Sequence, residues 1–292
     1  MLKIAVVGAA NLDIRSASAK PMLSSDSNPG TVGLFPGGVG RNLAQDFAQM
    51  GDDVTFYTAI GEDSQGDIVK ASLKAMKVVL APSQGMATGT YVCMEDSDGR
   101  LLFAVNAMEI ASAITVDFLR SYEKDLLASD VIVLETNIPK QAVDYLSSLD
   151  ARLACDAVST FKAVKLKDCL DRLTYCKMNR AEARILAGLD ESASFDSLVE
   201  ALSKGDRVNL VSLGDQGSCL FSSRELARKP APKASIVSVN GAGDALFAAV
   251  VHCLCLGYDY DRALEIGNRA CRLSLESMQA VSEKLGPGIF KD

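Results

Sequence analysis

The sequence contains no tryptophan and a single histidine, His252, which lies inside an apolar stretch. A Ser-His-Asp or Cys-His mechanism or a histidine-rich metal centre therefore has little to be built from, and we expect His252 in the core. The eight cysteines form no C-x-x-C pair, which favours free thiols in a reducing cytoplasm over disulfides or a zinc site. Acid–base chemistry is therefore expected from carboxylates or lysines.

Long hydrophobic runs and an excess of positive charge are also missing. The longest apolar run, ALFAAVVHCLCLG, is shorter than the about 20 residues that span a bilayer, and the start, MLKIAVVGAANLD, lacks the pattern of a signal peptide. The formal net charge of −7 argues against nucleic acid or an anionic membrane as the main partner. We expect a cytoplasmic globular protein that binds small molecules.

Two nucleotide-binding fingerprints are absent. The chain has no G-x-x-x-x-G-K-[ST] motif and no G-x-G-x-x-G after the first strand. It is therefore neither a P-loop NTPase nor a protein with the usual dinucleotide fingerprint.

What is present is a regular alternation of strand-like apolar runs and helical patterns. Strands are expected at 2–10, 53–60, 130–136, 151–157, 173–178 and 207–214, and helices at 40–50, 64–77, 115–129, 139–149, 179–188, 193–204, 242–256 and 260–282. This alternation predicts a single α/β domain over residues 1–292, with a doubly wound, mostly parallel sheet flanked by helices.

Residues 14–35 and 88–106 break this alternation. They have the pattern of short strands with turns, including the turn sequence DSDGR at 96–100. We expect them to form a small β-sheet lid over the strand ends, and extra edge strands of the main sheet are the alternative.

Ligands of such sheets bind at the carboxyl ends of the strands. The polar or small residues that follow predicted strands are therefore candidates for the site: Asn11, Asp13, Glu135, Asn137, Asp156, Asn179, Ser212 and Gly214.

The stretch SVNGAGDALFAAV (238–250) places Gly241, Ala242, Gly243 and Asp244 directly before an apolar helix. Small residues leave backbone N–H groups uncovered, and a helix start adds positive potential, so an anion is favoured there. Asp244 either caps the helix or is a base held beside a transferring phosphoryl group.

Together with PGGVGRNLAQDFAQMG (36–51), these motifs resemble the two signatures of the ribokinase-like (PfkB) carbohydrate kinases. NRAE (179–182) is similar to the N-x-x-E of that family, SLGDQG (212–217) to its T-L-G-x-x-G, and GAANLDI (8–14) to its G-x-x-N-x-D. The motifs follow the family order and cover nearly the whole chain.

The resemblance implies a role for each matching residue. Asp244 is the expected general base, and the amides of Gly241, Ala242 and Gly243 the expected anion hole for the γ-phosphoryl group of ATP. The remaining assignments are Asn11, Asp13, Gly37, Gly38 and Asn42 for substrate hydroxyls, Asn179, Ser212, Gly214, Gly217 and Asn268 for ATP, and Glu182 for Mg²⁺ through water.

Some of these roles have simple structural alternatives. Asn179 and Glu182 also fit a helix capping box, and Asn268 fits a solvated helix residue. Ser212 replaces the usual threonine and keeps its hydroxyl. Ser238 stands where many members have an aspartate near a monovalent cation, which argues against K⁺ activation.

Three further stretches, FAVNAMEIASAIT (103–115), DAVSTFKAVKL (156–166) and LSLESMQAVS (273–282), are similar to segments of the pseudouridine kinases in this family. The resemblance implies ATP-dependent phosphorylation of a nucleoside 5′-hydroxyl and a homodimer formed through the lid. Asn106 on the lid, Asn137 after a strand and Lys162 at a helix start are expected near the substrate, and a surface lysine is the alternative for Lys162. The alternatives are a kinase for ribose, adenosine, inosine or guanosine, and a sugar-binding protein that has lost catalysis.

Overall fold

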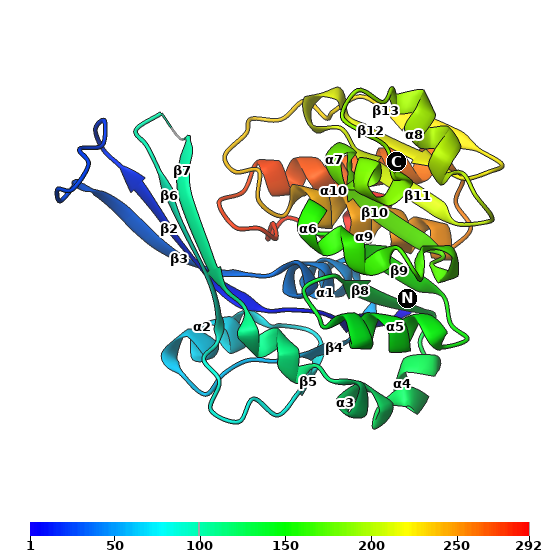
Figure 1. Cartoon of the computed structure of the whole chain (residues 1–292), viewed down its shortest axis with the longest axis horizontal. Helices are drawn as coiled ribbons and strands as arrows, with labels where there is room; N and C mark the ends of the chain where they lie inside the picture. Colours follow the sequence, from blue (N-terminus) through cyan, green and yellow to red (C-terminus); the bar gives the residue numbers. More distant parts are fainter. Residues whose placement is uncertain (99, 292) are drawn as a thin grey trace.

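The computed structural model describes residues 1–98 and 100–291, and it confirms the α/β fold (Figure 1). The main sheet has nine strands in the order β13-β12-β11-β10-β9-β8-β1-β4-β5. All neighbouring strands are parallel except at β12, which is antiparallel to both of its neighbours. These strands are β1 (Lys3–Val7), β4 (Asp53–Thr58), β5 (Lys77–Leu80), β8 (Val131–Glu135), β9 (Leu153–Asp156), β10 (Tyr175–Asn179), β11 (Val208–Ser212), β12 (Ser218–Phe221) and β13 (Leu226–Lys229).

Helices cover both faces of this sheet, as expected for strands that are almost entirely apolar. One face carries α1 (Val39–Met50), α9 (Ala242–Cys255) and α10 (Tyr260–Leu275), whose apolar side chains form one core cluster with the sheet. The other face carries a second cluster. Its helices are α3 (Val116–Arg120), α4 (Glu123–Leu127), α5 (Lys140–Ser148), α6 (Thr160–Ala163), α7 (Arg180–Ala187) and α8 (Phe195–Leu202).

The expected second, smaller sheet is present and projects from the body as a blade (Figure 1). Its order is β3-β2-β6-β7, and only β2 and β6 are parallel. The strands are β2 (Asn11–Ser18), β3 (Gly30–Gly37), β6 (Gly89–Glu95) and β7 (Leu101–Ala107), and α2 (Ser64–Ser72) lies at the base of the blade. The segments are therefore not edge strands of the main sheet, although Gly99 of the expected turn lies outside the described residues.

Several expected boundaries are wrong. The helix expected at 115–129 is two short helices, because the chain leaves the helical path at Ser121 and Tyr122. The last long helix ends at Leu275 rather than at residue 282, and the helix expected at 64–77 ends at Ser72. Strands β5, β12 and β13 are additional, and each has only four residues, which is too short for a clear periodic pattern.

The expectation of a core position for His252 is confirmed. It is 5% exposed, its Nδ1 lies 2.7 Å from Asp52 Oδ2, and its ring stacks on Phe290. All eight cysteines are free, and six of them are buried. Within residues 1–98 and 100–291, we find no helix with the length and apolar character needed to cross a bilayer.

One close backbone contact sets where the first long helix begins. A Cβ atom on Gly40 would lie 2.6 Å from the Cα of Gly8, so only glycine allows the start of α1 to press against the chain leaving β1. This contact brings the first turns of α1 to the carboxyl end of the sheet, where ligands bind in open α/β folds.

Candidate active site

Helix α9 begins at the carboxyl edge of the main sheet with Gly241 as its N-cap. Gly241 has φ 78°, and a Cβ atom there would lie 1.9 Å from the carbonyl oxygen of Ala280, so the position requires glycine. No side chain caps this helix, and Asp244 lies in its first turn. The interpretation of Asp244 as an N-cap is therefore wrong, and the first N–H groups of α9 have no side-chain acceptor at the cap.

The carboxylate of Asp244 is held by a residue from the other end of the chain. Asn42 Nδ2 in α1 donates a hydrogen bond of 2.8 Å to Asp244 Oδ2, across 202 residues of sequence. Both side chains are buried, with exposures of 6% and 7%. The packing of α1 against α9 therefore brings the two family-like signatures into one site, as the sequence predicts.

The surroundings of Asp244 make its carboxyl group a weaker acid than an ordinary aspartate. Burial and the negative charge of Asp156 raise the pKa of Asp244 to about 6, against the lowering effects of Lys177, the Asn42 hydrogen bond and Arg41. A carboxyl group with this pKa is ionised at neutral pH and still accepts a proton readily. It is suited to serve as a general base.

Lys177 joins the neighbouring strands β9 and β10 at this edge. Its Nζ lies 2.9 Å from Asp156 Oδ2, and a Cβ atom on Gly243 would lie 3.2 Å from the same nitrogen. The carboxylates of Asp156, Asp244 and Glu182 raise the pKa of Lys177 against the effect of its burial, so it stays charged. A fixed ammonium group thus lies beside the start of α9.

The turn after Asp156 is strained. Val158 has φ 61°, a conformation that a β-branched residue rarely adopts, and Ser159 N donates to the carbonyl of Ala157 at 2.7 Å across it. Val158 N donates in turn to Asp156 Oδ1 at 2.7 Å. This tight turn fixes the orientation of the Asp156 carboxylate.

A second polar group lies where β2 and β3 of the blade meet α1. Asn11 Nδ2 donates to Asp13 Oδ1 at 2.7 Å, and Arg15 Nη2 lies 3.1 Å from Asp13 Oδ2. Gly37 pairs with Asn11, and Gly38 is the N-cap of α1. Asn11, Asp13, Gly37, Gly38 and Asn42 therefore come together as the sequence predicts.

A third group surrounds the end of β8. The buried carboxylate of Glu135 accepts hydrogen bonds from Ala9 N and from both nitrogens of Asn137, each at 2.6 Å. Burial raises the pKa of Glu135 to about 7 despite these bonds. Lys162 Nζ on α6 donates to Asn137 Oδ1. Asn137 and Lys162 are thus in direct contact.

Asn179 and Glu182 form a complete capping box at the start of α7. Asn179 Oδ1 accepts from Glu182 N at 2.9 Å, and the Glu182 carboxylate accepts from Asn179 N and Nδ2 at 2.8 and 2.6 Å. The structural alternative is therefore realised, and it leaves the remaining lone pairs of Glu182 available. In the part of the chain that is described, no three His, Cys, Asp or Glu side chains are grouped closely enough to hold a metal on their own.

The expected nucleotide residues lie on the adjacent strand and loop. Ser212 ends β11 directly beside Asn179 in the register. A Cβ atom on Gly217 would lie 2.0 Å from the carbonyl oxygen of Lys229, and Asn268 Nδ2 donates to the carbonyl of Pro230 at 3.1 Å. Gly217 and Asn268 thus both lie against the chain at Lys229 and Pro230, which follows β13. Gly214 is exposed in the loop between β11 and β12.

Comparison with known proteins identifies the architecture and chemistry. The family model described as pfkB family carbohydrate kinase matches residues 1–285. The chain belongs to the pfkB family of carbohydrate kinases. It is therefore a phosphotransferase with an alcohol acceptor, and the ribokinase-like resemblance seen in its motifs is confirmed.

Individual relatives within the pfkB family carry different names. The chain is 29% identical to the pseudouridine kinase of Escherichia coli over 93% of its own length and 90% of that protein. It is 27% identical to the ribokinase of Bacillus subtilis, with coverage of 96% and 95%. A carbohydrate kinase structure from Agrobacterium tumefaciens has a TM-score of 0.85 at 27% identity and covers 100% of this chain and 96% of its own.

Five charged residues of this kinase site were not assigned a role from the sequence. Glu135 and Asp156 were recognised only as polar residues after strands, whereas Arg15, Arg41 and Lys177 were not singled out. A lysine inside the apolar run LTYCKM is a signal that could have identified Lys177. Asn106, by contrast, is exposed on β7 of the blade, away from the Asn42–Asp244 pair.

We expect Asp244→Asn to separate activity from stability. Without the base, phosphoryl transfer should fall by on the order of 10²–10⁴-fold. The folded pKa of Asp244, about 6, lies above the ordinary aspartate value of 3.8, so the native state holds this proton more tightly and loses stability as the pH rises from about 4 to about 6. The variant lacks this cost and should be more stable above pH 6, by up to about 3 kcal/mol.

Urea unfolding at pH 5 and pH 8, with steady-state rates at pH 8, checks both parts. Near-normal turnover would remove Asp244 from the mechanism, and a lower unfolding free energy at pH 8 would contradict a buried ionised carboxylate at this position.

Proposed function

We propose that this kinase transfers the γ-phosphoryl group of ATP to the 5′-hydroxyl of pseudouridine and releases pseudouridine 5′-phosphate and ADP. The observation that carries the proposal is the similarity to the E. coli pseudouridine kinase across 93% of the chain. Three stretches of this chain, at 103–115, 156–166 and 273–282, resemble the same group of kinases.

In the proposed reaction, Asp244 accepts the proton of the 5′-hydroxyl while the oxygen–phosphorus bond forms and the bond to ADP breaks. The carboxylate is buried, ionised at neutral pH and oriented by Asn42. The free N–H groups of Gly241, Ala242 and Gly243 at the start of α9 are suited to stabilise the negative charge on the transferred group. The fixed ammonium group of Lys177 adds positive charge on the same side.

The ribose is proposed to bind between the blade and α1. Asp13 uses one lone pair of each carboxylate oxygen on Asn11 and Arg15, so it keeps capacity for two substrate hydroxyls. Gly37 and Gly38 let a sugar approach the backbone closely beside it. A site that pairs buried polar groups with hydroxyls discriminates strongly against substrates that lack them.

The base is proposed to contact the polar face of the blade. Phe35, Asp13, Tyr91 and Asn106 lie in one row across its four strands, so their side chains share a face. Pseudouridine has a ring N–H donor that uridine lacks, and the carbonyl oxygen of Asn106 is an acceptor of the right kind. Asn137, which follows β8, and Lys162 on α6 are proposed to line the side of the substrate pocket that faces the main sheet.

ATP is proposed to bind along the loop of Ser212, Gly214 and Gly217, with the adenine near Asn268. Mg²⁺, which prefers oxygen ligands and keeps several waters, fits an outer-shell position beside Glu182, and when bound it would neutralise charge between the β- and γ-phosphates. Asn179 holds the Glu182 carboxylate in place through two hydrogen bonds. Ser238 supplies no carboxylate for a monovalent cation, so we propose no K⁺ requirement.

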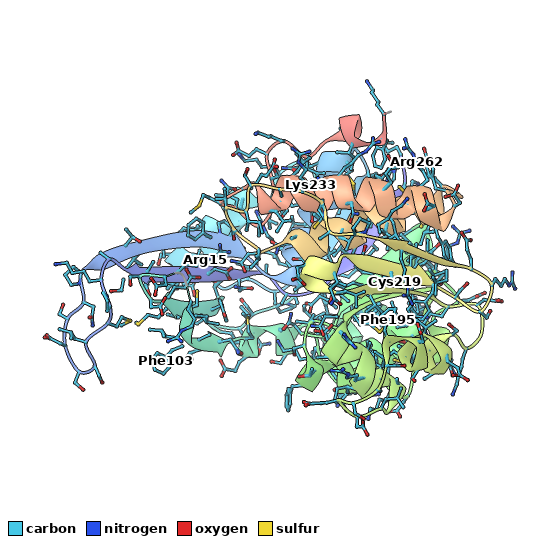
Figure 2. All side chains as sticks on the ribbon, turned by 90° about the horizontal axis from the view of Figure 1, so that it is seen from above. Arg15, Phe103, Phe195, Cys219, Lys233 and Arg262 are labelled. Atoms are coloured by element: carbon cyan, nitrogen blue, oxygen red, sulfur yellow. The ribbon has the colours of Figure 1, made fainter. Side chains whose placement is uncertain are left out.

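We also propose that two copies of the kinase pair through the outer face of the blade. On β3, β6 and β7, the face opposite to the polar row carries exposed apolar side chains, and this outer apolar face consists of Val32, Leu34, Val92, Met94, Phe103 and Val105. Phe103 is 71% exposed and Val105 69%, and Figure 2 places Phe103 on the projecting blade. A two-fold pair buries the same patch of both copies, which explains a continuous apolar sheet face on a polar protein.

Glu182→Gln should raise the Mg²⁺ concentration for half-maximal activity several-fold and change the KM for nucleoside less, because the neutral amide attracts the hydrated ion less strongly. Ser194→Ala, which removes the cap of the neighbouring helix α8, is the control for lost capping. If Glu182→Gln lowers only the thermal stability, as the control should, the carboxylate has a capping role alone.

A substrate panel distinguishes the kinase specificities. We expect kcat/KM for pseudouridine to exceed the values for uridine, adenosine, inosine, guanosine and ribose by at least about tenfold, with ADP release as the readout. A higher value for ribose would instead fit the likeness to the B. subtilis ribokinase. No ADP release with any of them would favour a binding protein that has lost catalysis.

Phe103→Asp should convert a dimer into a monomer in light scattering, because it places a charge in the centre of the proposed interface. Ala104→Asp is the matched control, since its side chain lies on the opposite face of the same strand and should leave the mass unchanged. A monomeric wild-type protein at working concentration would contradict pairing through the blade.

A further inference from the structure

Arg41 is a buried arginine beside the proposed catalytic pair. It lies in the first turns of α1 and is 4% exposed. Its Nη1 donates to Asn42 Oδ1 at 3.0 Å and to the carbonyl of Pro36 at 3.4 Å. Asn42 in turn donates to Asp244, so the three side chains form one continuous hydrogen-bonded chain.

The chemistry of the three groups gives this chain a fixed direction. A guanidinium has only donors, and an ionised carboxylate has only acceptors. The amide of Asn42 between them can therefore satisfy both partners in a single orientation, with its oxygen toward Arg41 and its NH₂ toward Asp244. Without Arg41, the amide could rotate and present its oxygen to the carboxylate.

We propose that Arg41 is a positioning residue that orients Asn42 and, through its charge, keeps Asp244 ionised for catalysis, an inference that rests on the proposed role of Asp244 as the base. The charge of Arg41 lowers the pKa of the buried Asp244, in the same direction as the larger effects of Lys177 and the Asn42 hydrogen bond.

The charges that act on Arg41 and Asp244 come from five elements. Asp46 on α1, Asp13 on β2 and Asp244 on α9 act on Arg41, and Asp156 on β9 and Lys177 on β10 act on Asp244. Asp46 is fully buried, and neither of its carboxylate oxygens has a hydrogen-bond partner among the residues that the structure describes. Burial and the charge of Asp244 hold the pKa of Asp46 well above its usual range.

Asp46 therefore holds its proton more tightly than an ordinary aspartate, and its carboxyl oxygens make no hydrogen bond to Arg41. The positive charge of Arg41 is left to act on the carboxylates of Asp244 and Asp13. Arg41 thus serves the proposed base and the proposed ribose ligand together.

Three variants separate the charge of Arg41 from its hydrogen bond. Arg41→Gln keeps a donor without charge, Arg41→Met removes both, and Arg41→Lys keeps the charge. The pH dependence of kcat and kcat/KM for the best substrate of the panel is measured from pH 5 to 9. Thermal unfolding is recorded for each variant.

The wild-type activity should fall as the pH drops through about 6. In Arg41→Gln and Arg41→Met this acid limb should move to higher pH by about 1 unit, a loss of about fivefold at pH 6 that is largely recovered at pH 8 in Arg41→Gln. Arg41→Met should also have a lower plateau, because Asn42 is no longer oriented. Arg41→Lys should keep the wild-type limb.

Arg207→Gln is the matched control. Arg207 is also 4% exposed and donates to an asparagine, with Nε 2.9 Å from Asn209 Oδ1, but it lies at the amino end of β11, opposite to the site. This variant should lose stability without moving the acid limb. Should Arg41→Met fail to fold, Arg41→Gln provides the same test of the charge.

An unmoved acid limb in Arg41→Gln, with only stability reduced as in the control, would overturn the proposal. That result together with an inactive Asp244→Asn refutes the role of Arg41 alone. An active Asp244→Asn instead refutes the proposed base, whatever Arg41 does.

Discussion

A carboxyl group buried where α9 meets α1 and the sheet imposes the main constraint on this site. Asp244 is 7% exposed, and Asp156 adds a second negative charge nearby. Burial of an unpaired charge is costly, so the surrounding elements must supply compensating groups. The parallel pairing of β9 and β10 brings Lys177 to Asp156, and the packing of α1 on α9 brings Asn42 and Arg41 to Asp244. The arrangement of strands and helices at this edge therefore also determines which charges surround Asp244.

Much of this arrangement could be predicted from the sequence. The alternation of apolar runs with helical patterns is a strong signal, and it correctly gave the doubly wound sheet with its helices and the smaller second sheet. The glycines around residues 37–40 and 241–243 marked two helix starts where the backbone is uncovered. Because such starts gather at the carboxyl ends of parallel strands, the contact of Asn42 with Asp244 followed from the two motifs.

The rest depends on features that leave no recognisable pattern in the amino-acid sequence. Strands β12 and β13 have four residues each and no periodic pattern, and the break at Ser121 and Tyr122 follows no proline or glycine. Arg41 and Lys177 are charged residues, which are usually exposed, and their burial becomes intelligible only once their partners from other elements are known. Pairings over 200 residues, such as His252 with Asp52, are decided by tertiary packing alone.

The distance in sequence between Asn42 and Asp244 also bears on how the protein is made. On the ribosome, the blade and α1 emerge long before α9, and proteins of this size commonly pass through partly folded states. Until α9 arrives, the apolar side chains of α1 that pack on α9 in this core cluster have no cover. A nascent or truncated chain that ends before α9 therefore lacks Asp244, and its uncovered apolar surface is accessible to proteases and chaperones. Cellular quality control can therefore remove incomplete copies before they accumulate.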